Sequence, residues 1–525
     1  MKKIQRKKQI VFIASFLLIF LICVLLMMGG SFFAENDAKI AQDLLEKMAS
    51  VPADTRLSVI IQYDGEPQSQ DFTQLGLLGA TLLKELPLID ALNAEISADR
   101  ISELAQSTRV KRVSPDREVH ACLNIASPTV GSNSSITYYN LTGRGVTVAV
   151  LDSGIVPSKE ELTTSDGRSR VVANIDFVNE GTQLGFDYYG HGSYVSGIIG
   201  MKTHLDQSGN IILTGIAPEA SIASVKVLDS MGRGKVSSVI EGIQWCVEHA
   251  GMFNIRILNL SLSHPIYESC TTDPLTLACE KAWNSGLVAV VAAGNHGEDQ
   301  HGYGTIGSPG NDPFVLTAGA TDDLDSTSRS DDILPSFSSK GPALQDYILK
   351  PDIMAPGTSV FSVRASGSYL DTTYPANRVS LDGISYPYFQ LNGTSVAAAI
   401  VSGTAALMIE KEPSLTPSTV KARLMKSADK AFHADIYTRG AGYLNIVSAL
   451  LESGVAVSSK SPRVLQTTTG VSVEEINWGS GGFWEEHWIW GDEISWGEDI
   501  IDGDLTVWGS SALLNYQNAW NSSEK

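Results

Sequence analysis

The stretch Val146-Thr-Val-Ala-Val-Leu-Asp152-Ser-Gly154 decides the fold class. Its apolar residues run on without alternation, which is typical of a strand buried on both faces in a parallel sheet covered by helices. The strand ends on a carboxylate, and the carboxyl ends of parallel strands are where α/β proteins build their sites. An Asp in this position also commonly caps a turn, so this stretch alone predicts a buried strand and not yet a site.

Further strand-like runs alternate with helical stretches between Gly145 and about Ser453. This alternation is the signature of parallel βαβ units. We therefore predict an α/β domain with a doubly wound, mostly parallel sheet over residues 123–458. Its further strands are expected at Ile222 to Val227, Ile255 to Leu260, Leu287 to Ala292 and Phe314 to Ala318.

A small α+β unit is predicted before this domain, over residues 35–122. Leu57 to Tyr63 and Arg109 to Val113 read as strands, and Ala98 to Gln106 reads as a short helix. The stretch from Asn124 to Gly145 is rich in Ser, Thr, Asn and Gly, which is the composition of a linker.

The first 34 residues have the pattern of an export signal. Five basic residues precede an apolar run from Ile10 to Met28, which is followed by small residues. The run is longer than a usual signal core and long enough to span a bilayer, so a cleaved signal and a retained anchor both stay open. We predict a secreted protein, with anchoring to the outer face of the cell membrane as the alternative.

Composition and charge narrow the classes of partner. The 525 residues are 43% hydrophobic and 18% charged, as in folded proteins, and the net charge is −20. We predict no nucleic-acid partner, because binding through a general basic field needs the opposite charge.

Four cysteines lie beyond the apolar run, in what would be an oxidising compartment. Two alternatives are equally open for them: a disulfide loop between Cys270 and Cys279, or buried free thiols. These cysteines are Cys122, Cys246, Cys270 and Cys279.

An acidic, Trp-rich tail is predicted over residues 459–525. Seven of the nine Trp residues of the chain lie there, and six of them share a six-residue register. Six is a multiple of the strand period of two and would place these rings on one face of a strand, whereas a helix would scatter them. We expect an ordered, β-like repeat. The six are Trp478, Trp484, Trp490, Trp496, Trp508 and Trp520.

Two further motifs carry groups that complete a nucleophilic site with Asp152. Gly190-His191-Gly192 places an imidazole between glycines where a helix begins, and Asn392-Gly-Thr-Ser395 places a hydroxyl at the start of an apolar helix. A serine needs an imidazole to take its proton, and the imidazole needs a carboxylate to fix its tautomer. We predict Asp152, His191 and Ser395 as the catalytic trio.

A fourth fragment supplies an oxyanion donor. Val290-Val-Ala-Ala-Gly-Asn295 is a buried strand that ends in a carboxamide. Asn295 can donate to a developing oxyanion, together with the backbone N–H of Ser395 at the positive end of its helix. Each fragment is common by itself, but the four in this order are not.

These motifs resemble the subtilisin family of serine proteases, from Asn124 to Leu450. The family usually has Thr-His after the catalytic His, where Ser193 and Tyr194 stand, and Met-Ala-Ala-Pro after the Ser, where Val396 to Ala399 stand. Further resemblance lies in Leu228 to Gly234, Asn259 to Leu262, Phe337 to Pro342 and Lys350 to Gly357.

The resemblance implies a substrate cleft and a propeptide. Its cleft walls are expected at Gly232 and Gly234 on one side and at Ser261, Leu262 and Ser263 on the other; Ser263 stands where the family usually has Gly. Residues 56–117 are similar to the inhibitory propeptide that such enzymes remove themselves. No cofactor is required; calcium, which the family often uses, is possible, but no metal residues are predicted.

We predict an exported serine endopeptidase, made as a self-processing zymogen, with polypeptide substrates and its own propeptide as inhibitor. A lipase-type hydrolase would need the order Ser, Asp, His and a Gly-x-Ser-x-Gly elbow, which are not found around Ser395. A surface-display protein built on a degenerate protease scaffold is the second alternative, against which the intact trio argues.

Overall fold

The computed structural model divides into two compact units, residues up to Asp116 and residues from Arg117 onward. No structure is described for the apolar run from Ile10 to Met28, and none of the helices in the described parts is long and apolar enough to cross a membrane. The residues described are 38–122, 140–156, 160–181, 183–205, 208–209, 211–298, 302–324, 332–380, 388–430, 434–467, 470–476, 478–479, 489–490, 512–518 and 520.

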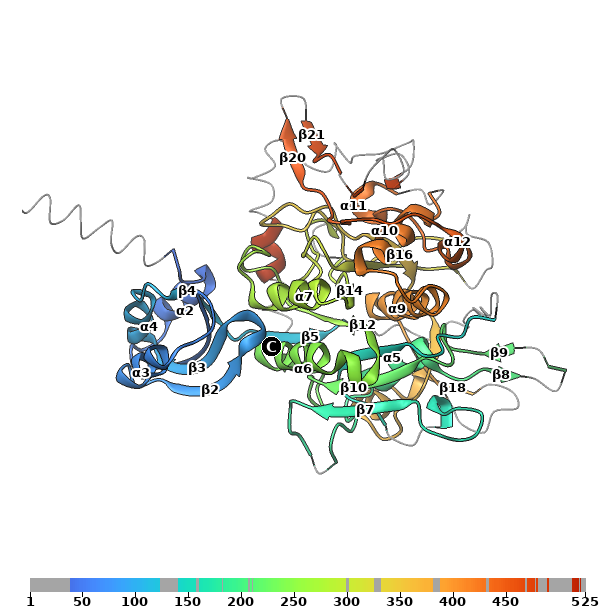
Figure 1. Ribbon diagram of the computed structural model, residues 1–525, viewed down its shortest axis with the longest axis horizontal. Coiled ribbons are helices and arrows are strands. Elements are labelled where there is room, and N and C mark those ends of the chain that lie inside the picture. Colours follow the sequence, from blue (N-terminus) through green and yellow to red (C-terminus); the bar gives the residue numbers. More distant parts are fainter. Residues whose placement is uncertain are drawn as a thin grey trace, which may run out of the picture. The chain divides into compact units, whose positions relative to one another are not determined.

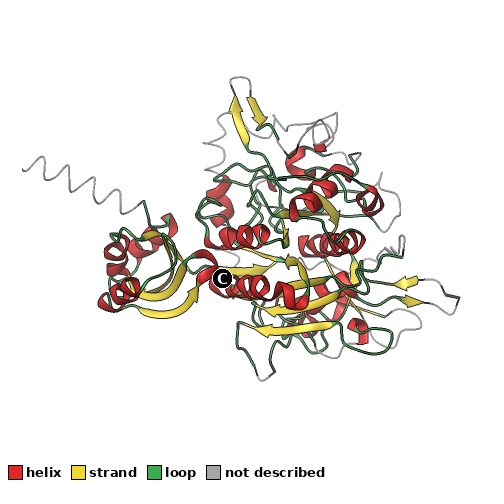
Figure 2. Cartoon of the chain, viewed as in Figure 1, coloured by secondary structure: helices red, strands yellow, loops and turns green. Residues whose placement is uncertain are grey.

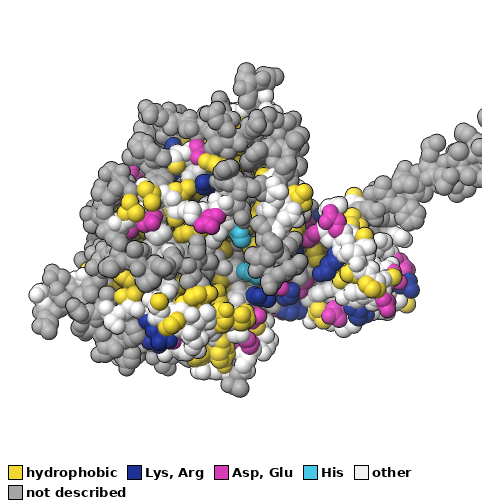
Figure 3. Space-filling model, turned by 180° about the vertical axis from the view of Figure 1, so that it is seen from behind, with side chains coloured by type: hydrophobic (Ala, Val, Ile, Leu, Met, Phe, Trp, Pro, Cys, Tyr) yellow, Lys and Arg dark blue, Asp and Glu magenta, His cyan; other side chains and the backbone are white. Residues whose placement is uncertain are grey.

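The smaller unit is an antiparallel sheet of four strands with helices packed on it (Figure 2). Alternate residues of strand β1 (Arg56–Tyr63), among them Val59 and Ile61, are buried in one cluster with Leu44 and Leu104 of the helices. Lys/Arg and Asp/Glu side chains are interspersed on the face of this unit drawn in Figure 3. Its elements are α2 (Gln42–Ser50), β1 (Arg56–Tyr63), α3 (Ser69–Leu77), β2 (Thr81–Leu86), β3 (Ala91–Ser97), α4 (Ala98–Ala105) and β4 (Val110–Pro115), with the sheet order β2-β3-β1-β4.

The larger unit is built on a seven-stranded sheet in which neighbouring strands are parallel throughout. Two pairs of helices, α5 with α9 and α6 with α7, cover its opposite faces (Figure 1). The predicted doubly wound α/β fold is confirmed. The strands, in sheet order, are β16 (Ile353–Pro356), β15 (Leu316–Thr321), β14 (Val288–Ala292), β12 (Ile255–Leu260), β6 (Thr147–Asp152), β10 (Ser221–Lys226) and β7 (Val171–Asp176); the helices are α5 (His191–Gly200), α6 (Val236–Phe253), α7 (Pro274–Asn284) and α9 (Thr394–Lys411).

Smaller elements surround this framework. β8 pairs with β9, and β19 lies between β17 and β18. These smaller elements are β8 (His204–Leu205), β9 (Ile211–Leu213), β17 (Val360–Ser362), α8 (Tyr369–Thr373), β18 (Arg378–Val379), β19 (Tyr388–Leu391), α10 (Pro417–Ser427), α11 (Ile436–Arg439) and α12 (Ile446–Leu451).

The four cysteines of the described residues are buried free thiols, so Cys270 and Cys279 do not form a disulfide loop. They are Cys122, Cys246, Cys270 and Cys279.

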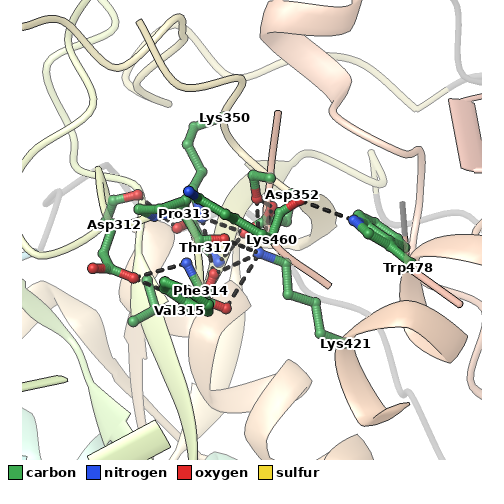
Figure 4. A network of polar contacts seen from close by, with 12 residues as sticks. Asp312, Pro313, Phe314, Val315, Thr317, Lys350, Asp352, Lys421, Lys460 and Trp478 are labelled. Atoms are coloured by element: carbon green, nitrogen blue, oxygen red, sulfur yellow. Dashed lines mark hydrogen bonds and ion pairs between the residues drawn. The ribbon is translucent and has the colours of Figure 1, made fainter. Parts of the chain in front are cut away.

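A buried charge network ties the sheet to α10 and to the chain beyond it (Figure 4). The Asp352 carboxylate lies 2.7 Å from Lys350 Nζ and 3.1 Å from Lys421 Nζ, and it accepts a hydrogen bond from Ser461 Oγ. Burial alone would raise the pKa of Asp352, but the two ammonium groups lower it below its ordinary value. Burial lowers the pKa of Lys421 to about 7, although Asp352 opposes this.

Asp352→Asn is expected to destabilise the protein by about 3–5 kcal/mol, because two buried ammonium groups lose their counterion. The measurement is calorimetric unfolding in a Ser395→Ala background, which prevents self-cleavage. The matched control is Asp166→Asn, a carboxylate paired with Arg168 on the surface, which should leave the melting temperature unchanged. Equal melting temperatures for Asp352→Asn and the control would show that the network contributes nothing to stability.

The described residues after Ser459 belong to the larger unit. β20 (Val464–Thr467) and β21 (Gly470–Val473) form an antiparallel hairpin. Trp478 and Trp490 are buried in one cluster with Ile436, and Trp478 Nε1 donates to the carbonyl of Lys460. The described tail residues therefore share the core of the catalytic unit.

The prediction of a β-like Trp repeat is wrong for the described residues 489–490, 512–518 and 520, which are helical. Ala512, Tyr516 and Trp520 lie four residues apart and are buried, whereas Leu514 is 57% exposed. This helical spacing of apolar residues outweighs the sixfold spacing of the Trp residues. Trp484, Trp496 and Trp508 lie outside the described residues.

Candidate active site

Asp152 and His191 form the first half of the site. Asp152 is the last residue of β6 and His191 the first of α5, and both side chains are fully buried. His191 Nδ1 lies 2.9 Å from both carboxylate oxygens of Asp152. Because a carboxylate only accepts, Nδ1 carries the proton and Nε2 is left as the acceptor. His191 Nε2 is buried and has no hydrogen-bond partner among the residues that the structure describes.

Asp187 holds the loop in which His191 lies. Its carboxylate accepts hydrogen bonds from Gly190 N at 2.6 Å, Ser193 N at 2.8 Å and Ser153 Oγ at 2.8 Å. Burial raises the pKa of Asp187, against the lowering effect of these donors. Asp187 was not among the predicted site residues, and its position four residues before His191 does not by itself indicate a role.

Gly192 is required by the close approach of two loops. A Cβ atom at this position would lie 2.2 Å from the carbonyl oxygen of Gly154, in the loop that follows β6. Glycine therefore lets the start of α5 sit directly against the loop that carries Ser153, whose hydroxyl accepts from Gly192 N at 2.9 Å.

Ser395 and Asn295 form the second half. Ser395 is the second residue of α9, and its neighbour Thr394 donates to Asn295 Oδ1 from both its backbone N (3.0 Å) and its hydroxyl (2.9 Å). These two bonds fix the carboxamide and leave Nδ2 as the outward donor. Asn295 Nδ2 is buried without a hydrogen-bond partner in the described part of the chain. It is thus a donor held ready for an acceptor.

A strand from earlier in the chain occupies the cleft between the predicted walls. β5 (Glu118–Ala121) is the middle strand of a three-stranded antiparallel sheet, between β11 (Arg233–Lys235) and β13 (Leu262–Ser263). Ala121 N donates to the carbonyl of Gly232 at 3.0 Å, and Cys122 N donates to the carbonyl of Ser261 at 2.9 Å. The sequence analysis did not predict this strand.

The five predicted substrate-binding residues all border this strand. Gly234 pairs with Val119, Leu262 with Ala121, and Ser263 with His120, while Gly232 and Ser261 accept the backbone bonds just described. Gly232 has φ +75°, and a Cβ atom there would lie 2.6 Å from the ring of Tyr189, so glycine is needed in this wall.

The hydroxyl of Ser395 is directed to Cys122, and His191 Nε2 and Ser395 Oγ form no hydrogen bond with each other in the described part of the chain. Ser395 Oγ donates a hydrogen bond to the carbonyl oxygen of Cys122. The thiol of Cys122 lies 3.1 Å from Ser263 Oγ, so Ser263 contacts the side chain of Cys122. Burial, assisted by the Asp152 charge, raises the pKa of Cys122 to about 12, which keeps the thiol neutral.

A buried ion pair anchors the beginning of the same segment, and the sequence analysis missed it. Arg117 Nη1 lies 2.7 Å from Glu268 Oε1, with both side chains buried, and the guanidinium lies 5.3 Å from the ring centre of Tyr267. Salt-bridge and cation–π contacts of a desolvated Arg are among its stronger interactions. Residues 117–122 are thus held at both ends.

No group of three or more His, Cys, Asp or Glu side chains in the described ranges could hold a metal ion. Calcium binding stays a prediction without assigned residues.

Comparison with known proteins identifies the family. Residues 143–443 match the model of the subtilase family of peptidases. Serine protease AprX of Bacillus subtilis is 36% identical, with 74% of this chain and 87% of that protein covered, and subtilisin E of the same species is 30% identical, with 71% and 83% covered. The solved structure of fervidolysin from Fervidobacterium pennivorans, a keratinolytic enzyme related to subtilisin, shares the fold at a TM-score of 0.58 and 21% identity, over 76% of this chain and 61% of that one. The chain belongs to the subtilase family and is a subtilisin-like serine endopeptidase.

Proposed function

We propose that this enzyme is exported as a zymogen, inhibited by residues 35–122, and that it activates itself by cutting the bond after Cys122. One observation carries the proposal: the Cys122 carbonyl accepts a hydrogen bond from Ser395 Oγ while the residues before it lie as a strand in the cleft. This contact places the carbonyl group of Cys122 beside the nucleophile, and such proximity favours attack.

The proposed catalytic steps use the three residues of the predicted trio. Ser395 Oγ attacks the carbonyl carbon of Cys122 as His191 Nε2 takes the hydroxyl proton, and Asp152 stabilises the imidazolium through Nδ1. His191 then gives that proton to the departing amine, and the C–N bond breaks to leave an acyl-enzyme on Ser395. Water, deprotonated by the same imidazole, releases the acid. A polypeptide substrate takes the same path once the propeptide has left.

The oxyanion formed in these steps needs donors in place before it appears. Asn295 Nδ2 and the backbone N–H of Ser395 at the start of α9 are the proposed pair. Both belong to a buried region, where a hydrogen bond to a developing charge is worth more than in water.

Asn295→Ala is expected to lower kcat by about 10²- to 10³-fold with little change in KM, because the lost donor serves the transition state more than the ground state. The measurement is steady-state hydrolysis of a small peptide anilide. A loss in kcat accompanied by an equally large rise in KM would show that Asn295 does not act as the oxyanion donor.

The inhibitory segment is proposed to stay in the cleft after the cut, as a product-like strand. Its backbone bonds to Gly232 and Ser261 and the Arg117–Glu268 pair do not depend on the bond after Cys122. Inhibition therefore ends only when residues 117–122 leave the cleft or are degraded.

Export is supported by the basic residues and the apolar run at the N-terminus. A cleaved signal and a retained outer-face anchor predict different N-termini for the zymogen, which its mass before activation distinguishes.

A fluorophosphonate probe tests the proposed enzyme against the scaffold alternative. We expect labelling of the wild type at Ser395 and no labelling of Ser395→Ala. A wild-type protein that is folded and freed of residues 35–122 but is not labelled would reject the proposed catalytic site.

A further inference from the structure

The described helical residues near the C-terminus lie beside the substrate cleft. We propose that Tyr516 and Trp520, among these helical residues, complete a binding subsite for an aromatic or imidazole side chain, three residues back from the scissile bond of the substrate. This rests on the proposed function, because the substrate is taken to replace β5 in the cleft.

A set of rings forms the proposed subsite. The ring centre of Trp520 lies 4.8 Å from that of His120 and 5.3 Å from that of His296, and Tyr516 lies 5.0 Å from His296. Such separations are those at which aromatic rings attract each other. His296 directly follows Asn295, so the ring set borders the proposed oxyanion donor.

The larger unit fixes the helix independently of His120. Gln517 Nε2 donates to the carbonyl of Ile266 at 2.6 Å, and Leu513 packs against the buried cluster of Ile266 and Ala293. Tyr516 and Trp520 are buried. The rings of the helix are therefore anchored by groups that remain when residues up to 122 have gone.

The register of β5 determines which substrate residue meets these rings. His120 pairs with Arg233 on one side and Ser263 on the other, two residues before Cys122. The side chain of its neighbour Val119 is buried and lies against Gly234. Because side chains alternate along a strand, a peptide in the same register presents its third residue, and not its second or fourth, to Trp520. A flat ring gains most there, because it can stack on the indole.

The test uses the mature full-length enzyme and three acetylated pentapeptide p-nitroanilides. Their sequence is that of residues 118–122 with alanine in place of the cysteine, and the third residue from the anilide is His, Phe or Ala. Wild type is expected to favour the His and Phe peptides over the Ala peptide by about 2- to 12-fold in kcat/KM, mainly through KM. Trp520→Ala should bring this ratio close to 1, and Trp520→Phe should retain a preference.

Leu514→Ala is the matched control, because Leu514 is on the same helix and 57% exposed. It should keep both the ratio and the activity, which separates the subsite from a general effect on the helix. Equal rates of wild type on all three peptides, an unchanged ratio in Trp520→Ala, or a mature enzyme that has lost residues 512–520 would each overturn the subsite while leaving the protease proposal intact. Absence of hydrolysis of every peptide, together with absence of fluorophosphonate labelling, would instead overturn the proposed function.

Discussion

Ser395→Ala is expected to remain joined across the bond after Cys122 and to lose about 10⁶-fold in kcat on peptide substrates. The hydroxyl of Ser395 contacts the carbonyl of Cys122, and its oxygen is the one atom of the enzyme that bonds to the substrate carbon in the proposed mechanism. With a methyl group in its place, the propeptide stays attached. The measurement is the intact mass of the variant, made in a host without other proteases.

The control for this experiment is the fold of the uncut Ser395→Ala variant. Circular dichroism should show that the uncut variant is folded, because the substitution removes one buried oxygen. If the variant has the same N-terminus as the wild type, another protease makes the cut and self-processing is wrong.

Asp152→Asn is expected to lower kcat by about 10⁴-fold, the second largest effect. An amide NH₂ at the position of a carboxylate oxygen donates to His191 Nδ1, which turns the imidazole to the tautomer with its proton on Nε2. That nitrogen can then no longer take the proton of Ser395. The first-order rate of the cut after Cys122 and hydrolysis of a peptide anilide measure the loss.

The surface variant Asp166→Asn serves as its control, because Asp166 pairs only with exposed groups and lies outside the site. Its rates should equal those of the wild type. A loss in Asp152→Asn of less than about tenfold would mean that the Asp152–His191 bond does not set the tautomer during catalysis.

The sequence predicted the central strands because each is an apolar run buried on both faces. β6, β10, β12 and β14 lie within one residue of their expected positions. β7 was missed because it is an edge strand with partly exposed residues, and β16 because it is short and ends at Pro356. Neither has the continuous apolar signal that periodicity detects.

Some residues of the candidate site could be predicted from the sequence and others could not. Residues whose chemistry is unusual for their position, such as an imidazole between glycines, could be named from the sequence. Asp187 could not, because it acts through three hydrogen bonds to a loop whose shape only the fold provides. β5 was also missed, since its pairing partners lie more than 100 residues away.

The tail was misjudged for a different physical reason. The Trp spacing has the period of a strand, but burial of Ala512, Tyr516 and Trp520, four residues apart, selects the helical spacing, and Leu513 of the same segment packs against Ile266 and Ala293. Tertiary packing outweighs a local pattern when the pattern alone buries little surface.

N-terminal sequencing of the wild-type enzyme at the earliest stage of its activation is the most direct test of self-processing after Cys122. The first new N-terminus is expected at Leu123, since Cys122 supplies the carbonyl that contacts Ser395. A first cut at any other bond, with the chain between Arg117 and Leu123 intact, would contradict the assignment of this strand as the enzyme's first substrate.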